Sequence, residues 1–75
     1  MSSITFKRAA EDEWRVYDHD GDHVGDVFLQ SDILEPGAHY FLVWLFEDPR
    51  GFVRVHDRSR VREIAQRRLD THPYF

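Results

Sequence analysis

The run HYFLVWLFED, residues 39–48, constrains the fold of this chain more than any other segment. In an extended strand successive side chains point to opposite faces, and here both faces are apolar. One face carries Phe41, Val43 and Leu45, and the other carries Tyr40, Leu42, Trp44 and Phe46. A strand that is apolar on both sides is normally buried on both sides. The rest of the chain must therefore supply two layers around this strand, or leave one apolar face for a partner.

Three other segments alternate apolar and polar residues, which indicates half-buried strands. They are residues 13–18, 23–29 and 51–57. Asp20 and Gly21 lie between the first two segments, and an Asp-Gly pair favours a tight hairpin turn because glycine adopts a positive φ at little cost. Proline and glycine at residues 36–37 and 48–51 mark the other turns. Residues 4–8 are expected to form an extended lead-in.

Residues 57–72 have the pattern of an amphipathic helix. Two candidate capping residues stand at its start, Asp57 and Ser59, whose side-chain oxygens can accept backbone N–H bonds. Apolar residues recur at helical spacing and form one stripe for packing on a sheet: Val61, Ile64, Ala65 and Leu69. Pro73 is expected to end the helix because proline cannot continue it.

Together these elements predict a single α+β domain over residues 1–75, a four-stranded antiparallel β-meander with one C-terminal helix packed on one face. A chain this short buries only about 60% of its unfolded surface, so its core is thin. One helix covers one face of the sheet, which leaves the other apolar face of residues 39–48 without a layer. Either a second copy or another protein covers that face, or the lead-in and the terminal Tyr74 and Phe75 fold across it.

The segment VYDHDGDHVGDVF, residues 17–29, concentrates acidic residues: Asp18, Asp20, Asp22 and Asp26. Their spacing matches positions 1, 3, 5 and 9 of an EF-hand loop, but that loop also needs glycine at position 6 and glutamate at position 12, where His23 and Leu29 stand. His19 and His23 are potential zinc ligands, yet no complete ligand set is evident. We predict no metal. The segment is a solvated turn, or an acidic surface that attracts a basic partner.

Signatures of catalysis are missing from the sequence. The chain has no cysteine, and its four serines lie in no nucleophile elbow. Its four glycines are scattered and form no phosphate-binding loop. No pair among its five histidines has a catalytic spacing. The sequence therefore predicts a protein that is not an enzyme and that uses no cofactor.

Charge is distributed unevenly along the chain, whose formal net charge is −4 at pH 7. Residues 1–48 contain eleven acids and three bases, and residues 49–75 contain three acids and seven arginines. Arginine pairs well with phosphate. The alternative function is therefore nucleic-acid binding by the helix, with Arg58, Arg60 and Arg67 as candidate contacts. The negative net charge argues against it, because nucleic-acid-binding domains are usually basic.

The run W-x-V-x-D-x-D-G-x-x-V-G, from Trp14 to Gly25, resembles runs in small bacterial and phage-borne proteins, without identifying a family. No stretch has the composition of a signal peptide or the length of a membrane span, so we expect a cytoplasmic protein without membrane contact. We expect a small interaction module, an accessory or inhibitory protein of a phage or mobile element. Its partner is a second copy, giving a homodimer, or another protein. The predicted contact is the sheet face of Tyr40, Leu42, Trp44 and Phe46.

Overall fold

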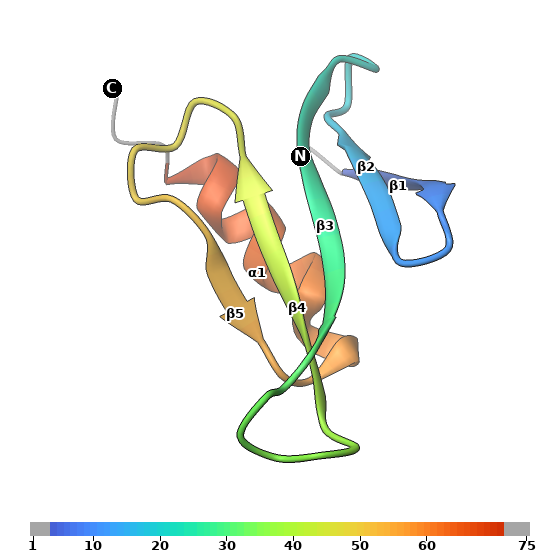
Figure 1. Cartoon of the computed structure of the whole chain (residues 1–75). Coiled ribbons are helices and arrows are strands. Elements are labelled where there is room, and N and C mark those ends of the chain that lie inside the picture. The colour runs from blue at the N-terminus through green and yellow to red at the C-terminus, as the bar shows by residue number, and fades with distance from the viewer. Residues whose placement is uncertain (1–3, 72–75) are drawn as a thin grey trace.

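The computed structural model describes residues 4–71 as one antiparallel sheet followed by a helical segment. The strands are β1 (Thr5–Ala10), β2 (Glu13–Tyr17), β3 (His23–Ser31), β4 (His39–Leu45) and β5 (Val53–Val55). Their order in the sheet is their order in the chain, so each strand pairs with the next along the sequence. Figure 1 shows α1 (Val61–Asp70) behind the sheet at β4, while the hairpin of β1 and β2 extends to the side. The predicted α+β architecture, with a helix on one face of an antiparallel sheet, is confirmed.

The sheet has five strands rather than the predicted four, because the lead-in forms a full strand. β1 pairs antiparallel with β2 and places Phe6 opposite Val16. The connection between them consists of two acidic residues and lacks the glycine, proline or asparagine that marks most tight turns. Arg8 stabilises this connection instead, since its guanidinium donates to the carbonyl oxygens of Ala10 at 3.2 Å and Glu11 at 2.6 Å. The lead-in therefore extends the sheet and does not fold across it.

The helical segment begins with a single 3₁₀ turn, Arg58–Arg60, and continues as α1. Asp57 caps the turn, as the sequence predicts. Its Oδ1 accepts hydrogen bonds from the backbone N–H of Ser59 at 3.0 Å and from the Ser59 hydroxyl at 2.7 Å. The α-helix itself is shorter than the predicted segment 57–72. The predicted terminator Pro73 and the aromatic pair Tyr74 and Phe75 lie outside the described residues.

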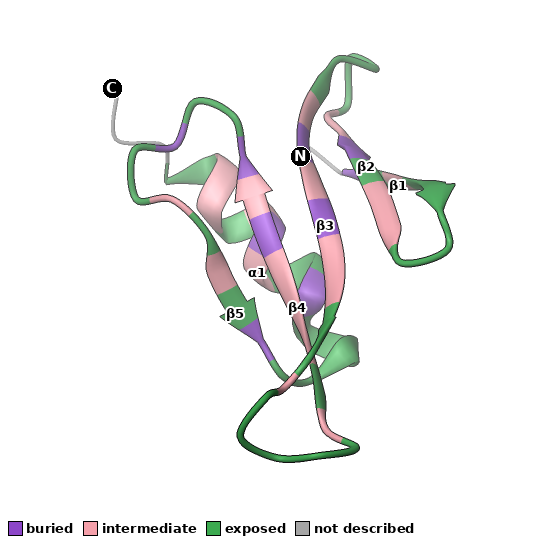
Figure 2. Ribbon diagram, viewed as in Figure 1, coloured by how far each residue is buried: buried purple, intermediate pink, exposed green. Residues whose placement is uncertain are grey.

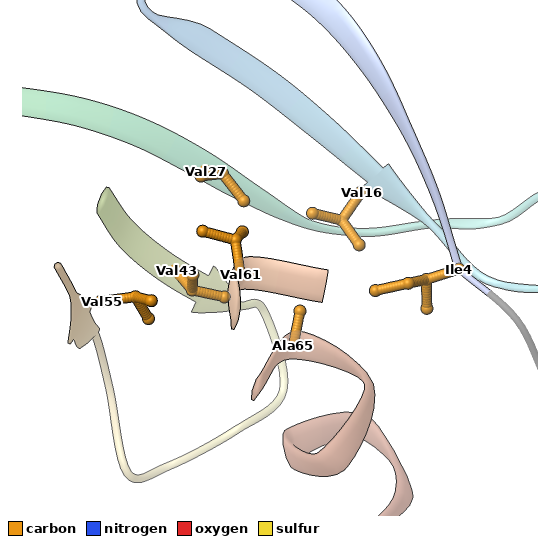
Figure 3. Close-up of a cluster of buried hydrophobic side chains, with 7 residues drawn as sticks. All are labelled: Ile4, Val16, Val27, Val43, Val55, Val61 and Ala65. Carbon is orange, nitrogen blue, oxygen red and sulfur yellow. The ribbon is translucent and has the colours of Figure 1, made fainter. Parts of the chain in front are cut away.

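The core lies between α1 and one face of the sheet, where the buried positions of Figure 2 gather. Its buried members are aliphatic residues, most of them valines: Ile4, Val16, Val27, Val43, Val55, Val61 and Ala65. Figure 3 shows these side chains converging from the strands and from α1. The predicted helix stripe is confirmed, because Val61 and Ala65 are buried and Ile64 and Leu69 pack against this cluster. A core of valines leaves little hydrophobic energy to spare, so polar contacts at its border carry weight.

β3 and β4 approach each other closely at Gly25, which is paired with Leu45. A Cβ atom placed on Gly25 would overlap the carbonyl oxygen of Trp44 and lie 2.8 Å from Leu45 Cδ2. Glycine is therefore required here by lack of space. Gly21, in the turn between β2 and β3, is required for a different reason, because its φ of 86° lies in the left-handed region although its surroundings are open.

A buried carboxylate joins the turn between β4 and β5 to the end of α1, and we call this contact the Asp48 lock. The Asp48 side chain is 1% exposed and accepts from Arg50 Nε at 2.8 Å and from an Arg68 guanidinium nitrogen at 3.2 Å. It also accepts from the backbone N–H of Arg50 at 2.9 Å. Arg50 in turn donates to the carbonyl oxygen of Arg68 at 3.1 Å. One charge thus fastens the last turn of the helix to the sheet.

The Asp48 lock should make the fold sensitive to acid. The hydrogen bond from the Arg50 side chain, opposed by burial and reinforced by the Arg50 backbone N–H and by Arg68, holds the pKa of Asp48 well below its ordinary value. A carboxylate with a lowered folded-state pKa stabilises the fold above its unfolded pKa of about 3.9, and this stability is lost as the pH falls below about 5. We expect the midpoint of urea unfolding to drop between about pH 5 and pH 3. The drop should be smaller in Asp48→Asn; equal acid sensitivity of the two proteins would contradict this assignment.

Candidate functional site

The sheet surface opposite α1, which we call the open face, bears no covering element within residues 4–71. The four residues predicted to form an interaction face all lie on it: Tyr40, Leu42, Trp44 and Phe46. Their neighbours along the strand, Val43 and Leu45, are buried on the other side. The register continues the open face onto the adjacent strands, where Phe28 and Arg54 both stand opposite Leu42. The four predicted side chains therefore share one surface, and binding of a partner to this surface stays a prediction.

Five rings in contact form a continuous line on the open face, which we call the aromatic strip: Tyr17, His23, Phe46, Trp44 and Phe52. Trp44 lies between Phe46 and Phe52 in this line, with its ring centroid 5.0 Å from that of Phe46 and 5.6 Å from that of Phe52. Phe46 contacts the His23 imidazole edge-to-face at 4.8 Å. Each such ring pair contributes about 0.5–1.5 kcal/mol beyond burial. These contacts hold the rings in place before any partner binds, which lowers the entropic cost of binding.

Positive charge lies at both outer strands of the open face. Lys7 Nζ, on β1, is 5.1 Å from the centre of the Tyr17 ring. The Arg54 guanidinium, on β5, is 5.0 Å from the centre of the Tyr40 ring. Both contacts have cation–π geometry, which is worth about 0.5–1 kcal/mol at exposed sites. The open face therefore has an aromatic centre between two cationic borders.

Acidic side chains are interspersed with these cations. Asp26 on β3 stands opposite Arg15 on β2, both on the open face. The Asp26 carboxylate also lies 2.9 Å from His23 Nε2, so it anchors one ring of the aromatic strip. Glu13, opposite Phe28, adds a second acid. The open face carries both signs of charge and is not a basic surface.

The predicted acidic hairpin surface is divided between two places. Asp26 lies on the open face, whereas the other three acids surround the turn between β2 and β3, with carboxylate oxygens within 4.8 Å of one another. Asp18 has a clear structural role there, because its Oδ1 accepts the backbone N–H groups of Asp20 and Asp22, both at 2.9 Å. Attraction of a basic partner by this turn stays a prediction.

The arginines proposed as nucleic-acid contacts lie on the helical segment, on the other side of the sheet from the open face. Arg60 and Arg67 both approach Glu63 Oε1, at 3.4 Å and 3.6 Å. Arg58 is exposed in the 3₁₀ turn. The shared glutamate reduces the positive potential of the pair, and nucleic-acid binding by this surface stays a prediction.

Three further arginines that add to the positive charge of residues 49–75 are engaged in the fold. Arg50 and Arg68 hold the Asp48 lock. Arg62 donates to the carbonyl oxygen of Ile4 and lies 5.1 Å from the centre of the Phe6 ring. Contacts that stabilise the fold therefore explain part of the arginine content of residues 49–75.

Sequence reasoning missed two exposed apolar features. Phe52 is 54% exposed and belongs to the aromatic strip; its alternation with Arg54 just before β5 was the available signal. Ile33 and Leu34, in the loop between β3 and β4, are 94% and 90% exposed. Figure 2 shows this loop exposed along most of its length. The signal for Ile33 and Leu34 was their position, since they are aliphatic residues in a turn-rich segment that has no strand or helix pattern to bury them.

Within residues 4–71 no helix combines the length and the apolar character needed to cross a membrane. Comparison of the chain with models of protein families, with curated proteins and with solved structures gave no match. The open face and the surfaces around it are therefore the features of residues 4–71 that bear on function.

Proposed function

We propose that this chain is a small protein-interaction module that acts by binding rather than by catalysis, and that a second copy of the chain binds its open face. The observation that carries this proposal is the aromatic strip, a line of ordered rings on a sheet surface that no described element covers. Contiguous exposed apolar surface usually marks an interaction site. Two-fold dimers, in which the same surface of each copy forms the interface, are the commonest homo-oligomers.

The dimensions of the open face suit an interface between proteins. Neighbouring strands lie ~4.8 Å apart, so five strands form a surface about 20 Å wide. Seven residues of β4 extend for about 24 Å at ~3.4 Å per residue. The flat area of this surface is therefore roughly 500 Å². Side chains that project from the sheet add accessible area, which brings the total toward the ~800 Å² per partner of a standard interface.

The mixture of charges on the open face favours a second copy over nucleic acid. A face that carries Lys7, Arg15 and Arg54 beside Glu13 and Asp26 can present opposite charges to a rotated copy of itself. Asp26 stands near the centre of this face, opposite Trp44, where it would repel a phosphate backbone.

Substitutions on the aromatic strip should separate the two copies. Phe52→Arg places a charge in the proposed seam, and because Phe52 is more than half exposed, the monomer should fold normally. Trp44→Arg affects the centre of the seam but also removes packing. We expect the wild type to elute as a dimer at about 50 μM, within the range of ordinary homodimer affinities, and Phe52→Arg to elute as a monomer. Light scattering after gel filtration measures both masses.

His39→Arg is the matched control, because it adds the same charge at an exposed position on the other side of β4. It should retain the wild-type mass. Circular dichroism identifies any variant that fails to fold. A wild type that is monomeric at this concentration, or a Phe52→Arg variant that keeps the dimer mass, would exclude the open face as the seam.

A further inference from the structure

The loop between β3 and β4 displays two aliphatic side chains, Ile33 and Leu34, which we call the tip. They are the most exposed large hydrophobic residues within residues 4–71. Hydrogen bonds hold the loop in one shape, since the backbone N–H of Asp32 donates to the carbonyl oxygen of Ala38 and that of Leu34 donates to Asp32 Oδ1, both at 2.9 Å. Figure 1 shows this loop projecting beyond the helix and the other strands. Among residues 4–71, the tip is therefore an apolar projection that the rest of the described chain leaves almost fully exposed.

A hollow of about 380 Å³ lies on the helix side of the sheet, and we call it the socket. α1 packs chiefly against β4, and the hairpin of β1 and β2 extends past the helix. The apolar lining of the socket comes from Phe6, Trp14, Val27 and Val61. Its volume falls in the range of roughly 300–1,000 Å³ that is usual for binding pockets.

The tip and the socket are complementary in charge as well as in polarity. Asp32 and Glu35 flank the tip, whereas Arg58 and Arg62 line the socket. Opposite charges around an apolar contact guide encounter and fix its orientation. The loop and the start of the helical segment, which borders the socket, lie toward the same end of the molecule in Figure 1. This placement lets two copies exchange tips about a two-fold axis.

We propose that the tip of one copy inserts into the socket of a second copy. Ile33 and Leu34 fill the apolar hollow, and the acids beside them meet Arg58 and Arg62 at its border. This contact is separate from the proposed open-face seam, because it uses no residue of the aromatic strip. Since it is smaller than a standard interface, it is weak and forms at high protein concentration. Where both contacts operate, they link open-face dimers into larger assemblies.

The test uses sedimentation velocity on Phe52→Arg, a background in which the open-face seam is disabled, at concentrations up to about 1 mM, the limit of weak association. We expect this protein to associate, and the double substitution Ile33→Asp with Leu34→Asp to weaken that association by about tenfold or more, as the loss of a central contact does. Both positions are almost fully exposed, so the variant should fold normally. A Phe52→Arg protein that stays monomeric throughout, or association unaffected by the tip substitutions, would overturn the proposal.

A charge exchange supplies the control. Glu35→Arg and Arg58→Glu should each weaken association, and the two together in one chain should restore it, because the signs become complementary again. Mixing the tip variant with Arg58→Glu should also restore part of the association, since each protein then contributes one intact half. If Glu35→Arg and Arg58→Glu together weaken association by the sum of their separate effects, the contact between tip and socket is refuted. Failure of the proposed open-face dimer has a separate signature. In that case the wild type and Phe52→Arg have the same mass at low concentration.

Discussion

Replacing Asp48 with alanine should lower the free energy of unfolding by about 3 kcal/mol, because the change leaves two arginines without their buried partner. The Asp48 side chain is almost inaccessible and accepts from Arg50 and Arg68. A domain of this length has only about 4–11 kcal/mol of stability at 0.05–0.15 kcal/mol per residue. The substitution therefore removes a large share of the total, and the last turn of α1 should loosen first.

Urea unfolding followed by circular dichroism measures this loss. Asp48→Asn should show a smaller loss, since an amide oxygen can still accept from the backbone N–H of Arg50. Asp20→Ala is the matched control: it removes an exposed aspartate from the turn between β2 and β3 and should change stability by no more than about 0.5 kcal/mol. If Asp48→Ala unfolds within that same margin of the wild type, the lock contributes nothing to the fold.

Among the described glycines, Gly25 should be the least tolerant of substitution by alanine. Gly25→Ala should lower the free energy of unfolding by about 3 kcal/mol, the upper end of the usual range for overpacking. The added methyl group would overlap the Trp44 carbonyl oxygen and press on Leu45. β3 and β4 would have to separate, which weakens the central pairing of the sheet. The neighbouring pairing of Gly25 with Val16 gives the strand no freedom to shift the other way.

Gly21→Ala separates the effect of space from the effect of backbone conformation. Gly21 has nothing within 4 Å of an added methyl group, but its φ of 86° strains any residue with a Cβ atom. Its cost should be about 1–2 kcal/mol, that of one residue held in the left-handed region. Thermal and urea unfolding of the two variants should therefore rank Gly25→Ala below Gly21→Ala in stability, and the reverse order would contradict the close approach at Gly25.

The elements with strong periodicity were predictable from the sequence, and those held by unusual contacts were not. Val43 and Leu45 alternate with Trp44 so regularly that the faces of β4 follow from the pattern alone. β1 was underestimated because its turn to β2 has neither glycine nor proline, and the stabilising contacts come from the Arg8 side chain. A local sequence pattern does not reveal that a nearby side chain donates hydrogen bonds to the carbonyl oxygens of a turn.

The Asp48 lock was hidden for a related reason. The segment DPRG has the composition of a solvated turn, and aspartate is rarely buried. Its burial depends on Arg68, twenty positions away, which no local pattern connects to it. The open face, in contrast, was predictable, because alternation along residues 39–48 specifies which side chains share a surface. Its extent was not, since Phe52 and His23 join the aromatic strip only through the pairing of neighbouring strands.

The sequential order of the strands bears on how the molecule assembles during synthesis. Each strand finds its partner immediately before it in the chain, so every hairpin closes a short loop at small entropic cost. The sheet can grow strand by strand behind the ribosome, with only the helix and the bond from Arg62 to Ile4, 58 positions apart, left to close at the end. The edge of each new strand is then soon covered by the next strand, and only the outer edges of β1 and β5 stay unpaired in the finished sheet that the described residues form. Rapid pairing of the strands therefore protects the nascent chain, whose folded surface still exposes the rings of the aromatic strip.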